Sequence, residues 1–313
     1  MRVLKHEKIM NDLEGRNCHA SQCLPLDTGE VFAVWFEGTR EGEDDVCIWG
    51  ALRDADGWHE KRRITEDDGL PHWNPVLDRN EDGSVTLYYK KGKPIAKWYT
   101  MKCTSVDHCR SFSEAAELVP GDIGGRGPVR NKNLHLKDGT LLAPASDEGF
   151  AWTAFVDISR DGGVSWEKSN ILSISQEKRH GIIQPTLWQD ENGVHMFLRS
   201  TEGNIFRSDS ADGFTWTQPR AVSMPNNNSG IDLTRLDDGR IFLVCNPTHR
   251  KDKRSPISLF ESRDGGEVFN RVLELEADDG QEYSYPCIRN VENTLHITYT
   301  YRRKSIAYWE IEV

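Results

Sequence analysis

Charged and hydrogen-bonding side chains stand at the ends of a series of short apolar runs in this sequence. Those near the start of a run are His19, His72, Asn74, Arg130, Lys132, Gln184, Ser229, Asp232, Tyr283 and Tyr285. Those near the end of the following run are Glu37, Arg40, Lys90, Lys91, Asp147, Glu148, Arg199, Asn246, Tyr299 and Arg302. Guanidinium, amide and carboxylate groups bind the hydroxyls and acid groups of sugars. The set predicts a site for a small carbohydrate if the fold gathers these ends on one face.

The apolar runs occur in pairs that repeat along the chain. A turn followed by an apolar, alternating segment begins at Gly29, Gly83, Gly139, Gly193, Gly239 and Asn293, with steps of 46 to 56 residues. A second short apolar segment precedes each of these turns. Two such segments joined by an Asp-Gly or Asn-Gly signal indicate a β-hairpin. The sequence therefore predicts six hairpins.

A second repeat lies between the hairpins and is centred on Ser and Asp. Its copies are Asp54–Trp58, Ser105–Phe112, Ser159–Trp166, Ser210–Trp216 and Ser262–Phe269. In each copy the Asp side chain can accept hydrogen bonds from nearby backbone N–H groups, and an aromatic residue closes the turn. Repeats of this length indicate stacked or radial units.

Together the two repeats give about four strands per unit, which predicts an all-β, six-bladed β-propeller. We expect residues 1–313 to form one domain, closed in its last blade by pairing of residues 1–10 with 305–313, because pairing removes two open sheet edges. All hairpins turn on one face of the disc, so the strand starts and strand ends share the opposite face. The first strand of each blade lines the central channel.

Composition narrows the possible partners. The formal net charge is −11 and no basic stripe is present, which argues against binding to nucleic acid or to an anionic membrane surface. No segment is long and apolar enough to span a membrane, and residues 1–15 contain no apolar leader, so we expect a cytoplasmic protein. The seven cysteines are scattered without metal-ligand spacing, and we expect no metal or other cofactor. The acidic run at 41–45 fits a solvated loop or a sugar-site carboxylate better than a Ca²⁺ site.

The Asp-centred turns and the six hairpins resemble those of the sialidase (neuraminidase) superfamily, and the resemblance covers essentially the whole chain. It implies an acid/base residue in the loop after the first hairpin, where this sequence has Asp44 and Asp45. It also implies that Arg199 and Arg254 bind a sugar carboxylate. By the same resemblance, Tyr283 of the Tyr283-Ser284 pair is the catalytic nucleophile.

Two positions depart from that family's pattern. His19 stands where the resemblance implies the first arginine, and Gln184 stands where it implies the glutamate that activates the tyrosine. An imidazole cannot form the bidentate contact of a guanidinium, and an amide cannot act as a base. The tyrosine then needs another activator, for which His19, Glu282 and Asp232 are the candidates.

Three functions fit these residues. The first is an exo-acting glycoside hydrolase for a glycan that contains an acidic sugar. The second is a uronate-directed lyase, in which His19 and Tyr283 transfer protons and an arginine neutralises the carboxylate. The third is a carbohydrate-binding propeller without catalysis. The predicted substrate-binding residues are Glu37, Arg40, His72, Asn74, Lys132, Arg199, Asp232, Arg254, Tyr285 and Arg302.

Overall fold

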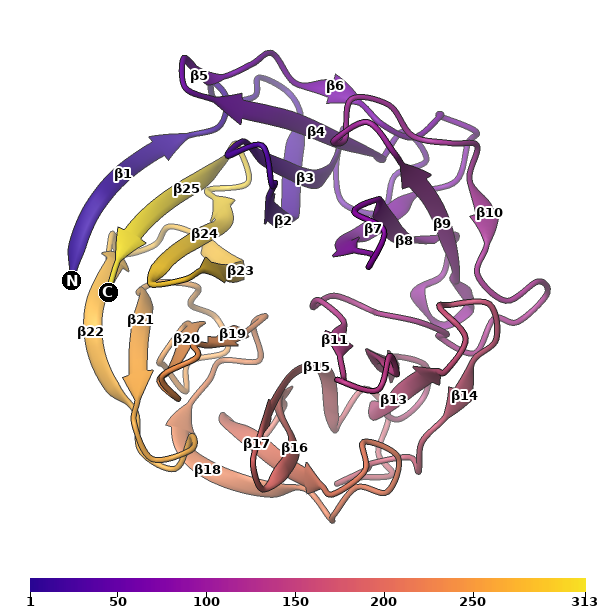
Figure 1. Ribbon diagram of the computed structural model, residues 1–313, viewed down its shortest axis with the longest axis vertical. Helices are drawn as coiled ribbons and strands as arrows, with labels where there is room; N and C mark the ends of the chain where they lie inside the picture. The colour runs from indigo at the N-terminus through magenta and orange to yellow at the C-terminus, as the bar shows by residue number, and fades with distance from the viewer.

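The computed structural model describes residues 1–313 and contains six antiparallel sheets arranged around a central axis (Figure 1). The predicted six-bladed β-propeller is confirmed. The only helical segment is the 3-10 turn η1 (Ile95–Lys97), and no helix is long enough to cross a membrane.

Each blade begins with the strand nearest the axis and proceeds outwards. Blade 1 contains β2 (Asn17–Pro25), β3 (Val31–Gly38), β4 (Cys47–Asp54), β5 (Gly57–Trp58) and β6 (Arg62–Arg63). Blade 2 contains β7 (His72–Arg79), β8 (Val85–Lys91), β9 (Tyr99–Ser105) and β10 (Ala116–Glu117). Blade 3 contains β11 (Leu134–His135), β12 (Leu141–Asp147), β13 (Thr153–Ser159) and β14 (Glu167–Lys168).

The second half of the ring follows the same order. Blade 4 contains β15 (Ile182–Asp190), β16 (Gly193–Ser200), β17 (Asn204–Ser210) and β18 (Arg220–Pro225). Blade 5 contains β19 (Asp232–Arg235), β20 (Ile241–Cys245), β21 (Ile257–Ser262) and β22 (Asn270–Glu276). Blade 6 contains β23 (Tyr283–Val291), β24 (Thr294–Tyr301), β25 (Ser305–Glu312) and, as its outermost strand, β1 (Arg2–Lys8).

The two ends of the chain meet in blade 6. Strand β1 pairs antiparallel with β25, from Arg2 opposite Glu312 to Lys8 opposite Ala307. In Figure 1 the indigo N-terminal strand lies outside the yellow C-terminal strand, with the two termini side by side. This pairing covers the outer edge of β25 and ties the first residues to the last blade.

Apolar side chains fill the spaces between neighbouring blades. One cluster joins blades 1 and 2 through residues such as Phe32, Val34 and Leu87, and another joins blades 5 and 6 through residues such as Phe242 and Ile297. Both faces of most inner strands are therefore buried, which explains their nearly continuous apolar sequences. The seven cysteines are buried and unpaired.

The Ser/Asp turns form as the sequence predicts. In the turn that follows β13, Ser159 Oγ donates to Asp161 Oδ1 at 2.8 Å, and Asp161 Oδ1 accepts from the backbone of Val164 and Ser165. The Ser-to-Asp bond recurs in the turns at Ser105, Ser210 and Ser262. These hydrogen bonds hold each turn at the outer part of its blade without any ligand.

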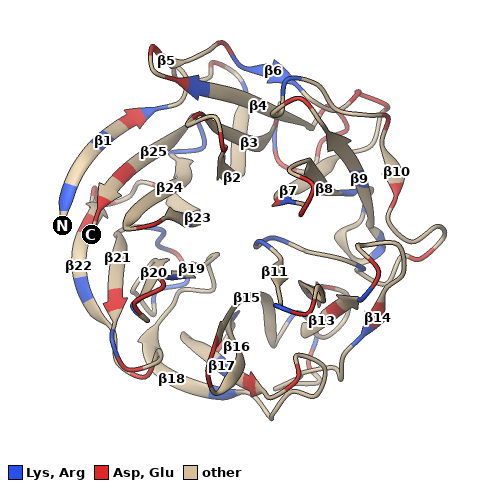
Figure 2. Cartoon of the chain, in the orientation of Figure 1, with Lys and Arg blue, Asp and Glu red and all other residues tan.

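Charged residues are dispersed around the disc rather than gathered on one side (Figure 2). Acidic and basic segments alternate along the outer strands and loops. This distribution agrees with the absence of a basic stripe in the sequence.

Candidate functional site

A repeated distortion marks the start of the inner strands. Ala20, Asn74, Gln184 and Tyr285 have φ angles of 56°, 43°, 54° and 55°, in the left-handed region that side chains rarely adopt. The pairing register shifts at each of these positions, as expected for a β-bulge. The bulges lie at the end of the channel opposite the hairpin turns. Four blades therefore keep a strained backbone at the same mouth, where it redirects side chains.

Tyr285 is the centre of this mouth. Arg199 Nη1 donates to its phenol oxygen at 2.6 Å. The guanidinium carbons of Arg130, Arg199 and Arg254 lie 5.5, 5.4 and 5.3 Å from the centre of its ring. The His19 ring is 4.1 Å away, centre to centre. Tyrosine surrounded by cations is suited to carry negative charge on its oxygen during a reaction.

A chain of hydrogen bonds connects Tyr285 in blade 6, through blade 4, to a carboxylate in blade 3. Arg199 Nη1 also donates to Gln184 Oε1 at 2.9 Å, and Gln184 Nε2 donates to Glu148 Oε1 at 2.9 Å. Arg199 is further fixed by donating from Nε to Asn228 Oδ1. Glu148 thus supplies, from the loop after β12, the carboxylate that residue 184 lacks.

Glu148 also lines a cavity of about 510 Å³ beside the mouth. The other walls include Trp73, Trp152, Lys93 and Arg179. Burial raises the pKa of Glu148, against the lowering effect of Arg199 and of the Gln184 hydrogen bond. A carboxyl group with a raised pKa next to a cavity can act as a general acid.

Glu282 provides a second carboxylate with the opposite behaviour. Its Oε1 accepts hydrogen bonds from Arg254 Nη1 at 2.7 Å, Arg303 Nε at 2.8 Å and Ser284 Oγ at 2.9 Å. Burial raises the pKa of Glu282, but the Arg254 and Arg303 charges and these hydrogen bonds outweigh it, so the pKa lies below its ordinary value. Two carboxyl groups whose environments drive their pKa values apart are typical of acid and base pairs.

His19 is a neutral residue in this setting. Its side chain is 1% exposed, Nδ1 lies 2.8 Å from Thr300 Oγ1, and Nε2 has no hydrogen-bond partner. Burial lowers the pKa of His19 well below its ordinary value, and repulsion from Arg303, Arg254 and other guanidinium groups adds to the effect. The imidazole therefore cannot replace a permanently charged arginine.

Tyr283 is not the central tyrosine. Its ring is buried between blades 5 and 6, and its hydroxyl donates to Asp278 at 2.7 Å and accepts from Arg302 Nε at 3.0 Å. Burial raises the pKa of this phenol, so it stays protonated. The bulge at Tyr285 is the physical reason, because it turns the later side chain towards the axis. Arg302 accompanies Tyr283 away from the mouth, while Arg303 contacts Glu282.

The acidic loop between β3 and β4 is only partly at the site. Asp44 pairs with Lys93, which lines the Trp73 cavity, so Asp44 stands at that cavity's edge. Asp45 instead accepts from the Thr39 backbone at 2.9 Å and pairs with Arg16. Asp45 therefore holds the loop and does not face Tyr285.

Two further predicted contacts of blade 1 have structural partners instead. Glu37 is buried against Trp35 Nε1 and Lys61 Nζ, at 3.1 and 2.5 Å. Arg40 extends into solvent and pairs with Glu43. Neither side chain contacts Tyr285: Glu37 is buried near the end of β3, and Arg40 lies in the loop that follows it.

The remaining predicted residues divide between the mouth and the interior. Asn74 occupies a bulge at the mouth and makes no side-chain hydrogen bond within the protein, so it is free to bind a ligand. His72 is buried between blades, where Nδ1 lies 2.8 Å from Thr65 Oγ1, and burial lowers its pKa to about 4. Lys132 and Asp232 pair at 2.9 Å deeper in the channel. Asp232 is thus excluded as an activator of the tyrosine.

The structure adds Arg303, Trp73 and Trp152 to the residues that line the site, and it joins Glu148, one of the strand-end residues, to Gln184. The sequence contained one signal for the tyrosine whose side chain reaches the axis. Asn74, Gln184 and Tyr285 each precede a proline at the same point of an inner strand. An X-Pro pair repeated in three blades marks a bulge and identifies Tyr285 rather than Tyr283.

No group of three or more His, Cys, Asp and Glu side chains is arranged to hold a metal ion.

Comparison with known proteins places the chain in a family. The model of the BNR repeat-like domain matches residues 29–297, whereas no curated protein matches the sequence. A crystal structure of a protein of unknown function from Dyadobacter fermentans is 15% identical with a TM-score of 0.82, covering 100% of this chain and 99% of the other.

Two solved sialidases share the fold at low identity. NanB sialidase from Streptococcus pneumoniae is 12% identical with a TM-score of 0.74, covering 98% of this chain and 70% of that one. Trypanosoma rangeli sialidase is also 12% identical, with a TM-score of 0.73, and the match covers 95% of this chain but 55% of that enzyme. The propeller is that of the sialidases, and the chain belongs to the BNR repeat-like domain family.

Proposed function

We propose that the protein is a sialidase-like exo-glycoside hydrolase that acts on a glycan containing an acidic sugar. The observation that carries the proposal is the position of the Tyr285 phenol, 2.6 Å from Arg199 Nη1 and beside the ring of His19. Such a phenol, surrounded by guanidinium groups, is suited to attack a carbon that develops positive charge. In this scheme Tyr285 is the nucleophile.

An anionic sugar is favoured by the charges at the mouth. Arg130, Arg199, Arg254 and Arg303 surround the site, and of these only Arg254 and Arg303 pair with a carboxylate. Arg254 uses Nη1 for Glu282, which leaves the rest of its guanidinium for a ligand. A carboxylate on the substrate would therefore bind at Arg254, near the Tyr285 ring.

The leaving group would enter the cavity beside Glu148. Tyr285 forms a bond to the anomeric carbon as the glycosidic bond breaks, and protonated Glu148 gives its proton to the departing oxygen. Water then releases the sugar from Tyr285, with Glu148 as the base. The tyrosine proton passes in the first step to the neutral His19 or to the ionised Glu282, whose Oε1 lies 3.9 Å from His19 Nδ1, and it returns to the Tyr285 oxygen when water releases the sugar.

A second candidate is a lyase acting on a uronate. It is favoured by the uncharged His19, whose Nε2 is unpartnered and whose ring lies tilted against Tyr285, 4.1 Å away centre to centre. A neutral imidazole is a competent base for the proton beside a carboxylate, and an adjacent phenol could protonate the leaving oxygen. The products differ, because a lyase leaves a double bond in the sugar.

The decisive test is a screen of aryl glycosides of sialic acid and of uronic acids, together with uronate-containing oligosaccharides. Release of the aryl alcohol by the unmutated protein, lost in Tyr285→Phe, is expected. New ultraviolet absorbance from an unsaturated uronate would favour the lyase instead. Saturable binding of the same sugars without turnover would show a carbohydrate-binding propeller and reject both enzymes.

A further inference from the structure

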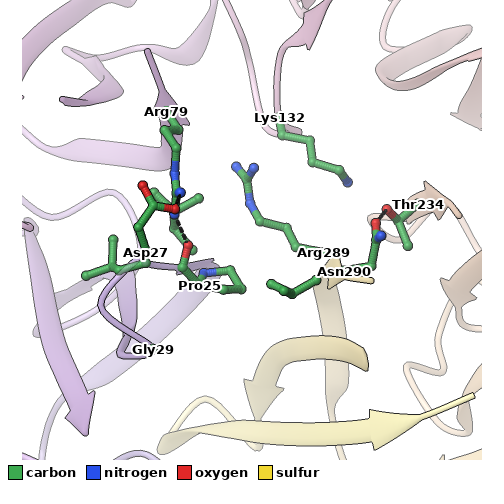
Figure 3. Close-up of a pocket in the computed structure, with 11 residues that line it drawn as sticks. Pro25, Asp27, Gly29, Arg79, Lys132, Thr234, Arg289 and Asn290 are labelled. Carbon is green, nitrogen blue, oxygen red and sulfur yellow. Dashed lines mark hydrogen bonds and ion pairs between the residues drawn. The ribbon is translucent and has the colours of Figure 1, made fainter. Parts of the chain in front are cut away.

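The hairpin-turn end of the channel holds a second cavity, of about 660 Å³, that the proposed reaction does not use. It is lined by residues from the ends of the inner strands and the turns that follow, including Asp27, Arg79, Lys132, Thr234, Arg289 and Asn290 (Figure 3). Arg289 follows Tyr285 by four residues in β23, which separates them by about 13 Å along a strand. The two sites therefore open on opposite faces of the disc.

Three cationic side chains from three blades meet around this space. Arg79 ends β7 in blade 2, Lys132 precedes β11 in blade 3, and Arg289 lies in β23 of blade 6. Figure 3 shows the Arg289 guanidinium extending towards the space between Arg79 and Lys132. Like charges this close together repel one another, and a bound anion would remove that repulsion.

The three cations differ in how they are compensated. Lys132 pairs with Asp232 at 2.9 Å, and Arg79 pairs with the exposed Asp27. Arg289 has no carboxylate partner. Its Nη2 donates to the Leu77 carbonyl, and its Nε is buried without a hydrogen-bond partner. Arg289 therefore brings an uncompensated positive charge to the cavity, and its Nη1 makes no hydrogen bond within the protein.

We propose that this cavity binds a tetrahedral oxyanion, a phosphate or sulfate group. A tetrahedral anion has enough oxygens to accept from the unused guanidinium donors of Arg79 and Arg289 at once. Lys132 lies beside them, with its three Nζ donors already bonded to Asp232 and Leu233. Thr234 and Asn290 add a hydroxyl and an amide to the wall, and Thr234 Oγ1 already donates to Asn290 Oδ1. The anion also offsets the repulsion between the guanidinium groups of Arg79 and Arg289. Burial lowers the pKa of Arg79, and this repulsion lowers it further.

Such an anion would tie blades 2 and 6 together across the axis through Arg79 and Arg289. A ligand that binds the folded state and not the unfolded one raises the melting temperature in a saturable way. Phosphate binding should therefore appear both in calorimetric titration and in thermal unfolding, at constant ionic strength and with chloride as the reference ion.

The test compares three arginine variants of the full chain titrated with inorganic phosphate. Arg289→Gln is expected to weaken binding about tenfold or more, since it removes a charge-assisted contact. Arg263→Gln is the matched charge control, because the Arg263 side chain is 71% exposed, and this variant should bind phosphate as the unmutated protein does. Arg254→Gln removes a guanidinium at the opposite mouth and should also leave phosphate affinity unchanged.

The proposal is overturned if the unmutated protein shows no saturable response, if Arg289→Gln binds normally, or if Arg254→Gln loses binding. Should Arg289→Gln not fold, a crystal of the unmutated protein soaked in tungstate decides the matter. Density between Arg79, Lys132 and Arg289 supports the site, and density only beside Tyr285 overturns it. A parallel titration with a hexose monophosphate separates the sources: tighter binding than free phosphate assigns a phosphorylated sugar, and equal binding assigns the free anion.

Discussion

The Ser/Asp turns and the bulged strand starts repeat around the same ring but differ in how fully their polar groups are paired. In the Asp161 turn, the carboxylate accepts hydrogen bonds from Ser159, Val164 and Ser165. At the Tyr285 mouth, His19 Nε2 has no partner and the backbone of Tyr285 is held in the left-handed region.

This difference in hydrogen-bond pairing indicates that the Ser/Asp turns stabilise the fold and that the Tyr285 mouth binds a ligand. A turn whose donors and acceptors are satisfied internally contributes to stability and leaves nothing for a ligand. A mouth with strained backbone and unfilled groups costs stability, and such costs are typical of functional sites. Substitutions in the turns should therefore change stability, and substitutions at the mouth should change binding and turnover.

The largest effect is expected at Tyr285. In Tyr285→Phe, kcat should fall roughly a thousandfold or more, because the nucleophilic oxygen is lost while the ring and its packing remain. Tyr283→Phe is the matched control, since it removes a hydroxyl bonded to Asp278 and Arg302 away from the axis. It should keep kcat within about twofold and lose about 1 kcal/mol of stability. Equal loss of kcat in both variants would contradict the placement of the nucleophile.

Glu148 should show its role in the pH dependence of the reaction. Burial raises the pKa of Glu148, so as a general acid it is active below that pKa and activity falls as pH rises through it. Glu148→Gln should lower kcat about a hundredfold or more and abolish this alkaline limb. The measurement is kcat against pH for both proteins on the substrate that the screen identifies. An unchanged alkaline limb in the variant would assign the acid to another group.

Ordinary sialosides should be poor substrates of the unmutated protein. His19 is neutral and cannot make the bidentate contact of a guanidinium, which costs about ten- to a hundredfold in affinity. Gln184 adds a loss in rate, because its amide cannot accept a proton. We expect turnover of a fluorogenic sialoside only in His19→Arg combined with Gln184→Glu. Efficient turnover by the unmutated protein would refute this expectation.

The smallest effect on function is expected in the turns. Ser159→Ala removes the hydroxyl that bonds Asp161 and leaves the Gly163 backbone N–H without its acceptor. The free energy of unfolding should fall by about 1–2 kcal/mol, with kcat and KM unchanged. Chemical denaturation measures the free energy of unfolding, and steady-state kinetics on the same sample measures kcat and KM. A change in KM would contradict the assignment of stability to the turns and of substrate binding to the mouth.

The architecture was predictable because hairpin and turn signals are local. The six blades follow from turns at nearly constant spacing, and Gln184 and Arg199 lie at the mouth because strand starts and ends share a face. His19 lies beside them for the same reason, since it opens the inner strand of blade 1. The expectation for Arg254, which lies in the loop between β20 and β21, comes from the family resemblance.

The structure differs from the expected placement of side chains where the chain departs from regular alternation. Tyr283 and Tyr285 have the same parity in a strand, and only the bulge at Tyr285 distinguishes the side chain that reaches the axis. Arg302 and Arg303 are both left-handed residues in the turn before β25, so alternation cannot show that Arg303 is the one bonded to Glu282. The partnership of Glu148 with Gln184 joins two blades, and no local signal encodes it.

The central claim of the proposed function is that an acidic sugar binds at the Tyr285 mouth. The most direct measurement is a crystal structure of the unmutated protein soaked with a panel of acidic monosaccharides. We expect a sugar ring above Tyr285, with its carboxylate at Arg254 and its leaving-group side towards Glu148 and Trp73. A sugar bound away from Tyr285, with this mouth left empty at saturating concentration, would contradict it.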